Sequence, residues 1–207
     1  MPAWVHDSRV GDDVRRGGPR DFDAEGLAKA EFDGWVGYYR REWRKVLAAS
    51  VRMVRLGFGM PWPKTLRGAW FVLRANQLWA PYPQNDPIGA RAYMRRFYAL
   101  VAEDGQMSFD PGKAAKLEVE WWRVHRLHQR EGQAVEDNLT RALVELYSYV
   151  YDVAPDKVQQ AALHRVIAMR HSDAWVQAGC KLDDPLLTEE LDELRRSYAA
   201  LLDAVRR

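Results

Sequence analysis

Residues 86–111 read DPIGARAYMRRFYALVAEDGQMSFDP, and they contain one complete helix and the start of another. Asp86-Pro87 is a helix start signal, because the aspartate caps free backbone N–H groups and proline suits the first helical turn. At about 100° per residue, the apolar side chains share one face and the arginines another. The apolar face comprises Tyr93, Met94, Phe97, Leu100 and Val101, and the basic face Arg91, Arg95 and Arg96. A second start signal follows at Asp110-Pro111.

Similar helical patterns, separated by short breaks rich in Pro, Gly or Asp, fill the chain on both sides of this segment. No segment alternates with period two for long enough to indicate a strand. We therefore expect an all-α fold, a single bundle of about seven helices. The expected helices cover 25–58, 63–79, a segment starting at 87, 111–131, 135–153, 155–178 and 185–205. Residues 1–24 have no apolar period and are expected to form a disordered tail before the helical domain, 25–207.

The segment 63–79 differs from the other helical segments because apolar side chains surround it almost completely. Leu66 and Trp70 share one side, while Phe71 and Leu78 cover others. A helix that is apolar all round is normally buried, so we expect this segment at the centre of the bundle. The first helix is expected to run unbroken over 25–58, with an apolar and a basic face.

Composition excludes several classes of protein. The 207-residue chain has one cysteine, Cys180, which excludes an internal disulfide framework and a Cys-rich zinc module. No apolar run approaches the roughly 18 residues of a membrane-spanning helix, and the N-terminus lacks the apolar core of a signal peptide, so a cytoplasmic location is expected. Nucleophile-elbow, phosphate-loop and dinucleotide-binding motifs are also absent, which leaves open whether the protein is an enzyme.

Basic residues and tryptophans concentrate in one part of the chain. Residues 36–101 carry twelve basic side chains against two acidic ones, although the whole chain has a net charge of only +2. An open basic surface would attract an anionic metabolite, acidic lipid or nucleic acid. The low overall charge and the absence of a nucleic-acid-binding motif make nucleic acid the least favoured of these. The acidic C-terminal helix could instead neutralise this surface, through Glu189, Glu190, Asp192 and Glu193.

The leading functional hypothesis is a binding protein for an anionic amphiphilic or aromatic small molecule, or for a partner protein. Peripheral membrane contact is a related use of the same basic region. A small-molecule site is mostly apolar with a few polar groups, and the second predicted helix supplies that mixture. The residues assigned to this site are Trp70, Arg74, Asn76, Gln77 and Trp79.

The alternative hypothesis is a metal-dependent oxidoreductase with non-haem iron or manganese inside the bundle. In the helix 111–131, Glu120, His128 and Glu131 project onto the apolar stripe, while Glu118 and His125 border it. Ferritin-like and haem-oxygenase-like bundles share the helix count, but the Glu-x-x-His spacing of di-iron bundles is absent. The proposed metal ligands are Glu120, His128, Glu131, His164 and His171. The competing interpretation is that these side chains only satisfy structural hydrogen bonds.

Overall fold

The computed structural model describes residues 17–131 and 136–206, and this part of the chain is all-α, as expected. It contains eight α-helices and one short 3-10 helix. The elements are α1 (Ala24–Tyr39), α2 (Trp43–Phe58), α3 (Trp62–Trp79), α4 (Pro87–Asp104), α5 (Pro111–Glu131), α6 (Glu136–Tyr151), η2 (Pro155–Val158), α7 (Gln159–Gln177) and α8 (Leu186–Val205).

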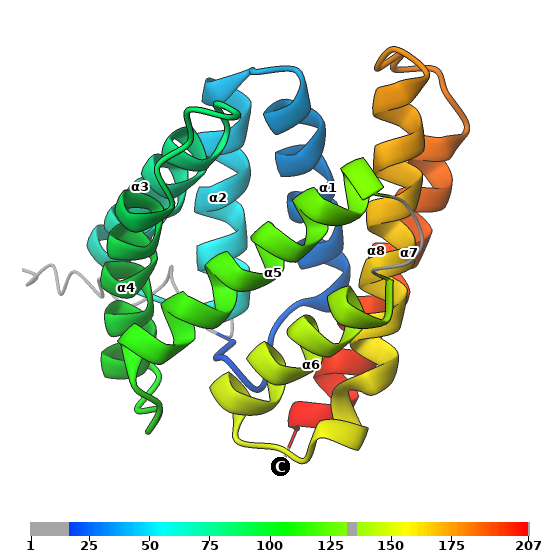
Figure 1. The fold of residues 1–207 in the computed structure, drawn as a ribbon. Helices are drawn as coiled ribbons and strands as arrows, with labels where there is room; N and C mark the ends of the chain where they lie inside the picture. Colours follow the sequence, from blue (N-terminus) through cyan, green and yellow to red (C-terminus); the bar gives the residue numbers. More distant parts are fainter. Residues whose placement is uncertain (1–16, 132–135, 207) are drawn as a thin grey trace, which may run out of the picture.

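The eight helices form a closed ring. Each helix packs against the next along the chain, and α8 returns to pack against α1. In Figure 1, α3 and α4 lie on the left, α1 and α2 behind, α7 and α8 on the right, and α5 and α6 cross in front. No helix occupies the middle of this arrangement, which leaves the inner sides of all eight helices facing a common centre.

The Asp-Pro start signals act as predicted. Asp86 accepts a hydrogen bond from the backbone N–H of Gly89 at 2.8 Å, and Asp110 accepts one from Lys113 at 2.7 Å. These aspartates satisfy backbone donors that the first helical turn leaves free.

The predicted first helix, 25–58, is wrong in one respect, because a tight turn divides it into α1 and α2. Arg41 adopts a left-handed backbone with φ of 61°. The N–H of Glu42 donates to the carbonyl of Gly37 at 2.8 Å, and that of Arg41 donates to Tyr38 at 3.1 Å. This hydrogen-bond pattern is a Schellman motif, which ends a helix and normally has glycine where Arg41 stands. The arginine is the reason that the break was not expected from the sequence.

The predicted central position of the second helix is also wrong. This helix, α3, is part of the ring wall, and Trp70 on its outer side is half exposed. The buried side of α3 includes small residues such as Gly68, Ala69 and Ala75. Small residues let neighbouring helices approach closely. The large apolar side chains divide between the two sides of α3: Phe71, Leu73 and Trp79 are buried, whereas Trp62, Leu66 and Trp70 are exposed.

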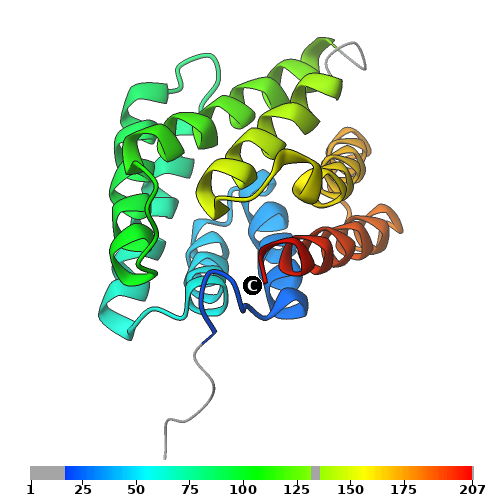
Figure 2. The ribbon, with the colours of Figure 1, turned by 90° about the horizontal axis from the view of Figure 1, so that it is seen from below.

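Part of the predicted N-terminal tail is packed against the ring. Phe22 is buried, with its ring 6.2 Å from that of Tyr198 and nearly perpendicular to it. The guanidinium of Arg20 donates to the carbonyls of Val205, at 3.2 Å, and Tyr151. Figure 2 shows this segment on the lower side of the ring, beside the C-terminal end of the chain. Residues 1–16 of the predicted tail lie outside the described residues.

None of the described helices combines the length and the apolar character needed to cross a membrane.

Candidate functional site

The ring encloses a cavity of about 400 Å³. All eight helices contribute to its lining, which is mostly apolar and includes twelve Trp, Tyr or Phe residues. Small-molecule sites in proteins typically enclose about 300–1,000 Å³ and are lined mainly by apolar and aromatic side chains. The cavity therefore has the size and the surface of a small-molecule site.

A buried ion pair crosses the inner wall of the cavity. Arg165 of α7 pairs with Glu31 of α1, and it also donates to the hydroxyl of Tyr147 at 2.8 Å. The hydroxyl of Tyr198 donates to the other oxygen of Glu31 at 2.8 Å. Burial by itself lowers the pKa of Arg165, but the carboxylate of Glu31 and the neighbouring groups raise it well above its usual value. Arg165 thus stays charged, and Glu31 balances its charge.

A second carboxyl group, that of Glu118 on α5, also lines the inner part of the cavity. It accepts hydrogen bonds from the hydroxyl of Tyr98 at 2.7 Å and from the indole N–H of Trp122 at 3.2 Å. Burial raises the pKa of Glu118, although the hydroxyl of Tyr98 and the charge of Arg165 oppose the shift. The inner wall therefore combines a neutralised ion pair with a carboxyl group that gains its proton more easily than an exposed glutamate.

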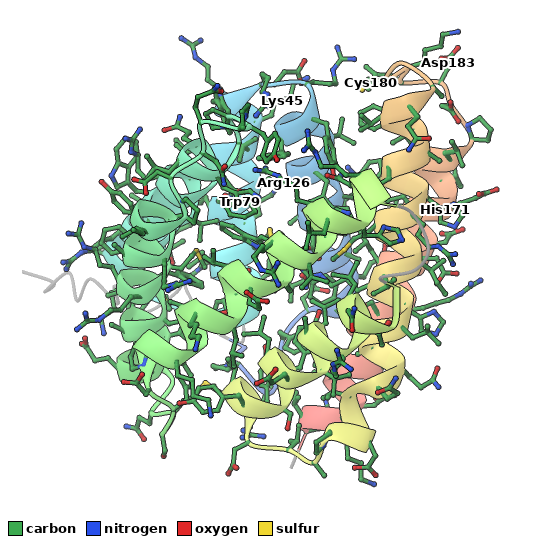
Figure 3. All side chains as sticks on the ribbon, viewed as in Figure 1. Lys45, Trp79, Arg126, His171, Cys180 and Asp183 are labelled. Atoms are coloured by element: carbon green, nitrogen blue, oxygen red, sulfur yellow. The ribbon has the colours of Figure 1, made fainter. Side chains whose placement is uncertain are left out.

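At the other end of the cavity, three lining side chains reach solvent. We call this end the mouth, and its residues are Arg41, Arg126 and Gln129. Arg126 Nη2 donates to the carbonyl of Trp79 at 3.0 Å, and its guanidinium lies 4.3 Å from the centre of the Trp79 ring. Figure 3 shows these two residues close together, in the upper part of the ring. Arg126 Nη1 is buried and has no hydrogen-bond partner among the described residues. The mouth thus carries two cationic side chains, one with an unused donor.

The predicted ligand-binding residues divide between the two sides of α3. Asn76 and Trp79 line the cavity. Trp70, Arg74 and Gln77 do not line it, and the guanidinium of Arg74 instead contacts the ring of Trp70 and the side chain of Gln77. Two of the five predicted residues therefore line the cavity and three lie on other sides of α3.

The predicted metal ligands do not come together in the described part of the chain. His164 pairs with Glu193 at 2.7 Å and His171 with Glu189 at 3.1 Å, so both bind partners on α8. Glu120 lies on the outer side of α5, where it pairs with Arg123 at 2.7 Å. The side chain of Glu131 lies outside the described residues. Among the residues that the structure does describe, no group of three or more His, Cys, Asp or Glu side chains is arranged to hold a metal ion.

His128 lies on a buried side of α5 but is not part of the cavity lining. Its side chain is largely buried, and neither ring nitrogen has a hydrogen-bond partner among the described residues. The nearest carboxylate is that of Asp173, 4.0 Å from Nδ1. Asp173 itself pairs with His125 at 3.0 Å and accepts a hydrogen bond from Gln129 at 2.6 Å.

Sequence reasoning missed Arg165, the buried cation of the site. On the helical projection, Arg165 falls between Ala161, Ala168 and Met169, all of which are buried. A charged residue in the middle of an apolar helix face is rarely buried unless it is paired, and this was the available signal. Glu31 occupies the corresponding position on α1, between Leu27 and neighbouring buried alanines.

The acidic C-terminal helix does not neutralise the basic region. Three of its carboxylates have partners on α7 or α8: Glu189 binds His171, Glu193 binds His164, and Asp192 binds Arg195. The carboxylate of Glu190 is buried and has no hydrogen-bond partner among the described residues. In Figure 1, α8 lies on the opposite side of the ring from α3 and α4. The basic surface of α3 and α4 is therefore not covered by α8.

No family model, no curated protein and no solved structure matches the chain, so its function has to be inferred from its own residues.

Proposed function

We propose that the protein binds an anionic amphiphile in the ring cavity, with the apolar or aromatic body inside and the anionic group at the mouth. The observation that carries this proposal is the combination of an aromatic cavity of about 400 Å³ with a buried, unpaired guanidinium nitrogen of Arg126 at its open end. A buried donor without a partner costs roughly 1–3 kcal/mol, which a ligand oxygen would recover.

The distribution of charge supports this orientation of the ligand. At the inner wall, Glu31 balances Arg165, and burial favours the uncharged form of Glu118. An anionic group placed there would find no uncompensated cation. At the mouth, Arg41 donates to the carbonyl of Ala80 and Arg126 to that of Trp79, and both guanidinium groups also lie near the hydroxyl of Tyr38. Neither arginine forms an ion pair with another described residue. Guanidinium groups bind carboxylates and sulfonates strongly because two N–H donors can act together.

The test uses 1-anilinonaphthalene-8-sulfonate, an aromatic anion that fluoresces in apolar sites, with decanoate and 1-decanol as competitors. We expect saturable binding of one probe molecule per chain and stronger displacement by decanoate than by decanol. Arg126→Gln should weaken decanoate binding roughly tenfold or more, the usual effect of losing a charge-assisted hydrogen bond. Decanol binding should change little.

Arg123→Gln is the matched control. Arg123 precedes Arg126 by three residues on α5, pairs with the exposed Glu120, and is not part of the cavity lining. It should leave the affinity for decanoate unchanged. Equal competition by decanoate and decanol, equal effects of the two arginine substitutions, or the absence of saturable binding would each contradict the proposal.

A further inference from the structure

Three large apolar side chains on α3 face solvent. Trp62, Leu66 and Trp70 are 54%, 55% and 51% exposed, although each is large enough to contribute to a core. Their spacing of four residues places them along one side of the helix, and we call this surface the α3 face. Scattered exposed apolar residues are ordinary, but a contiguous row of them marks a surface that binds something.

Arginines border the α3 face on both sides. From α2, Arg55 lies over the ring of Trp62 at 5.0 Å. On the side towards α4, Arg74 lies 6.0 Å from the rings of both Trp70 and Tyr93, and Arg96 lies 5.2 Å from that of Tyr93. In the part of the chain that the structure describes, Arg55, Arg67, Arg74 and Arg96 form no ion pair. In Figure 3, nitrogen-tipped side chains project from the side of the molecule formed by α3 and α4.

Acidic side chains are almost absent from this region. Between residues 43 and 101 the only one is Asp86, which caps α4. Glu103 and Asp104, at the end of α4, are bound by Lys64. The arginines bordering the α3 face therefore keep their charge available for an anionic partner.

We propose that the α3 face docks on the surface of an anionic phospholipid bilayer. Tryptophan favours the boundary between lipid headgroups and acyl chains, and arginine is attracted to anionic headgroups. A second copy of the chain fits less well, since pairing two α3 faces would bring their arginines together. This proposal is independent of the cavity ligand, because Trp62, Leu66 and Trp70 do not line the cavity.

The experiment is co-sedimentation of the full chain with phosphatidylcholine vesicles, with and without phosphatidylglycerol. We expect binding only when phosphatidylglycerol is present, a decrease in binding as salt is added, and a blue shift of tryptophan emission in the bound protein. Leu66→Ser should weaken binding roughly tenfold or more, because a large apolar contact with the bilayer is lost. Leu182→Ser is its control, since Leu182 is 59% exposed and lies in the connection between α7 and α8.

The contribution of charge is tested with two double variants of equal net charge. Arg67→Gln with Arg74→Gln should weaken binding roughly tenfold or more. Lys157→Gln with Lys181→Gln, at exposed positions outside α3 and α4, should have little effect. Comparable binding to pure phosphatidylcholine, no binding to either vesicle, or equal effects of the paired variants would overturn the proposal. A dimer that Leu66→Ser dissociates, without vesicle binding, would assign the α3 face to a second copy instead.

Discussion

Arg165 of α7 and Glu31 of α1 form an ion pair inside the ring. The two helices are not neighbours in the ring, because α8 packs between them. The side chains of Arg165 and Glu31 are 13% and 3% exposed. The pair therefore links two helices through the cavity rather than through a helix–helix interface. This position makes it important both for the stability of the ring and for the neutrality of the inner wall.

Arg165→Met is expected to destabilise the protein by about 3–5 kcal/mol, because Glu31 would remain buried without a compensating charge. The free energy of unfolding in urea measures this effect. Arg195→Met is the control, since Arg195 also binds a glutamate of α1, Glu25, but both side chains are exposed. The control should leave stability nearly unchanged. Similar losses in the two variants would show that the buried pair has no special role.

Glu190 should make the protein less stable as the pH rises. The pKa of Glu190 is raised from 4.5 to about 8. Burial is the largest cause and the nearby carboxylates of Glu31 and Asp173 add to it, whereas the hydroxyl of Ser172 opposes the shift. Between these two values the folded protein keeps a proton that the unfolded chain has lost. Stability should therefore fall between about pH 4.5 and pH 8, by up to about 1.4 kcal/mol for each pH unit, and the contribution should be constant above pH 8.

Glu190→Gln removes this titration, so the stability difference between the variant and the parent should grow in favour of the variant over the same pH range. Urea unfolding at a series of pH values gives the difference directly. Glu189→Gln, at the neighbouring exposed position, supplies the comparison. A pH-independent difference for Glu190→Gln would mean that Glu190 is already ionised in the folded protein.

Two tryptophans on α3 should respond very differently to substitution. Trp79 is buried, with its ring 5.8 Å from that of Trp122 and beneath Arg126, so Trp79→Ala should cost about 3–5 kcal/mol. Trp70 is half exposed, and Trp70→Ala should change the free energy of unfolding by less than about 1 kcal/mol. Chemical denaturation of both variants distinguishes the ring from a bundle with α3 at its centre, for which Trp70→Ala would be the costly change.

The segment before α1 should contribute to stability through Phe22. Phe22→Ala removes a buried aromatic side chain and should cost about 3–5 kcal/mol, whereas Phe22→Leu, which refills most of the volume, should cost less. In thermal or urea unfolding, the parent should be the most stable protein, Phe22→Leu less stable, and Phe22→Ala the least stable. A melting temperature that neither substitution alters would mean that this segment is not packed in solution.

Local signals in the sequence predicted much of the helix order but not the ring. Asp86 and Asp110 mark helix starts that depend only on neighbouring residues, and these were predicted correctly. The break at Arg41 was not predictable from the residue type, because arginine does not favour a left-handed backbone. Its guanidinium has one contact with a distant part of the chain, the carbonyl of Ala80 at 3.3 Å, and lies near the rings of its sequence neighbours Tyr38 and Trp43.

The cavity was harder to predict, because helical periodicity does not distinguish a side that faces a core from one that faces a hollow. Glu118 and His125 were placed at the border of the apolar stripe of α5, and both line the cavity. Glu120 was placed inside that stripe and lies on the surface. Side chains two residues apart on a helix point in nearly opposite directions. A small error in the side of the helix assumed to face the cavity therefore assigns surface residues to the cavity and cavity residues to the surface.

The packing of α8 against α1 also has a consequence for folding. The two are the first and last of the described helices, and the contact between Arg206 and Asp21, at 3.2 Å, joins residues 185 positions apart. Contacts of such long sequence separation form late, because a long loop must first be closed. Until α8 docks, the ring is open between α7 and α1, the helices that carry Arg165 and Glu31. The enclosed chamber therefore forms only when α8 packs against α1, and a ligand that requires it binds only the folded chain.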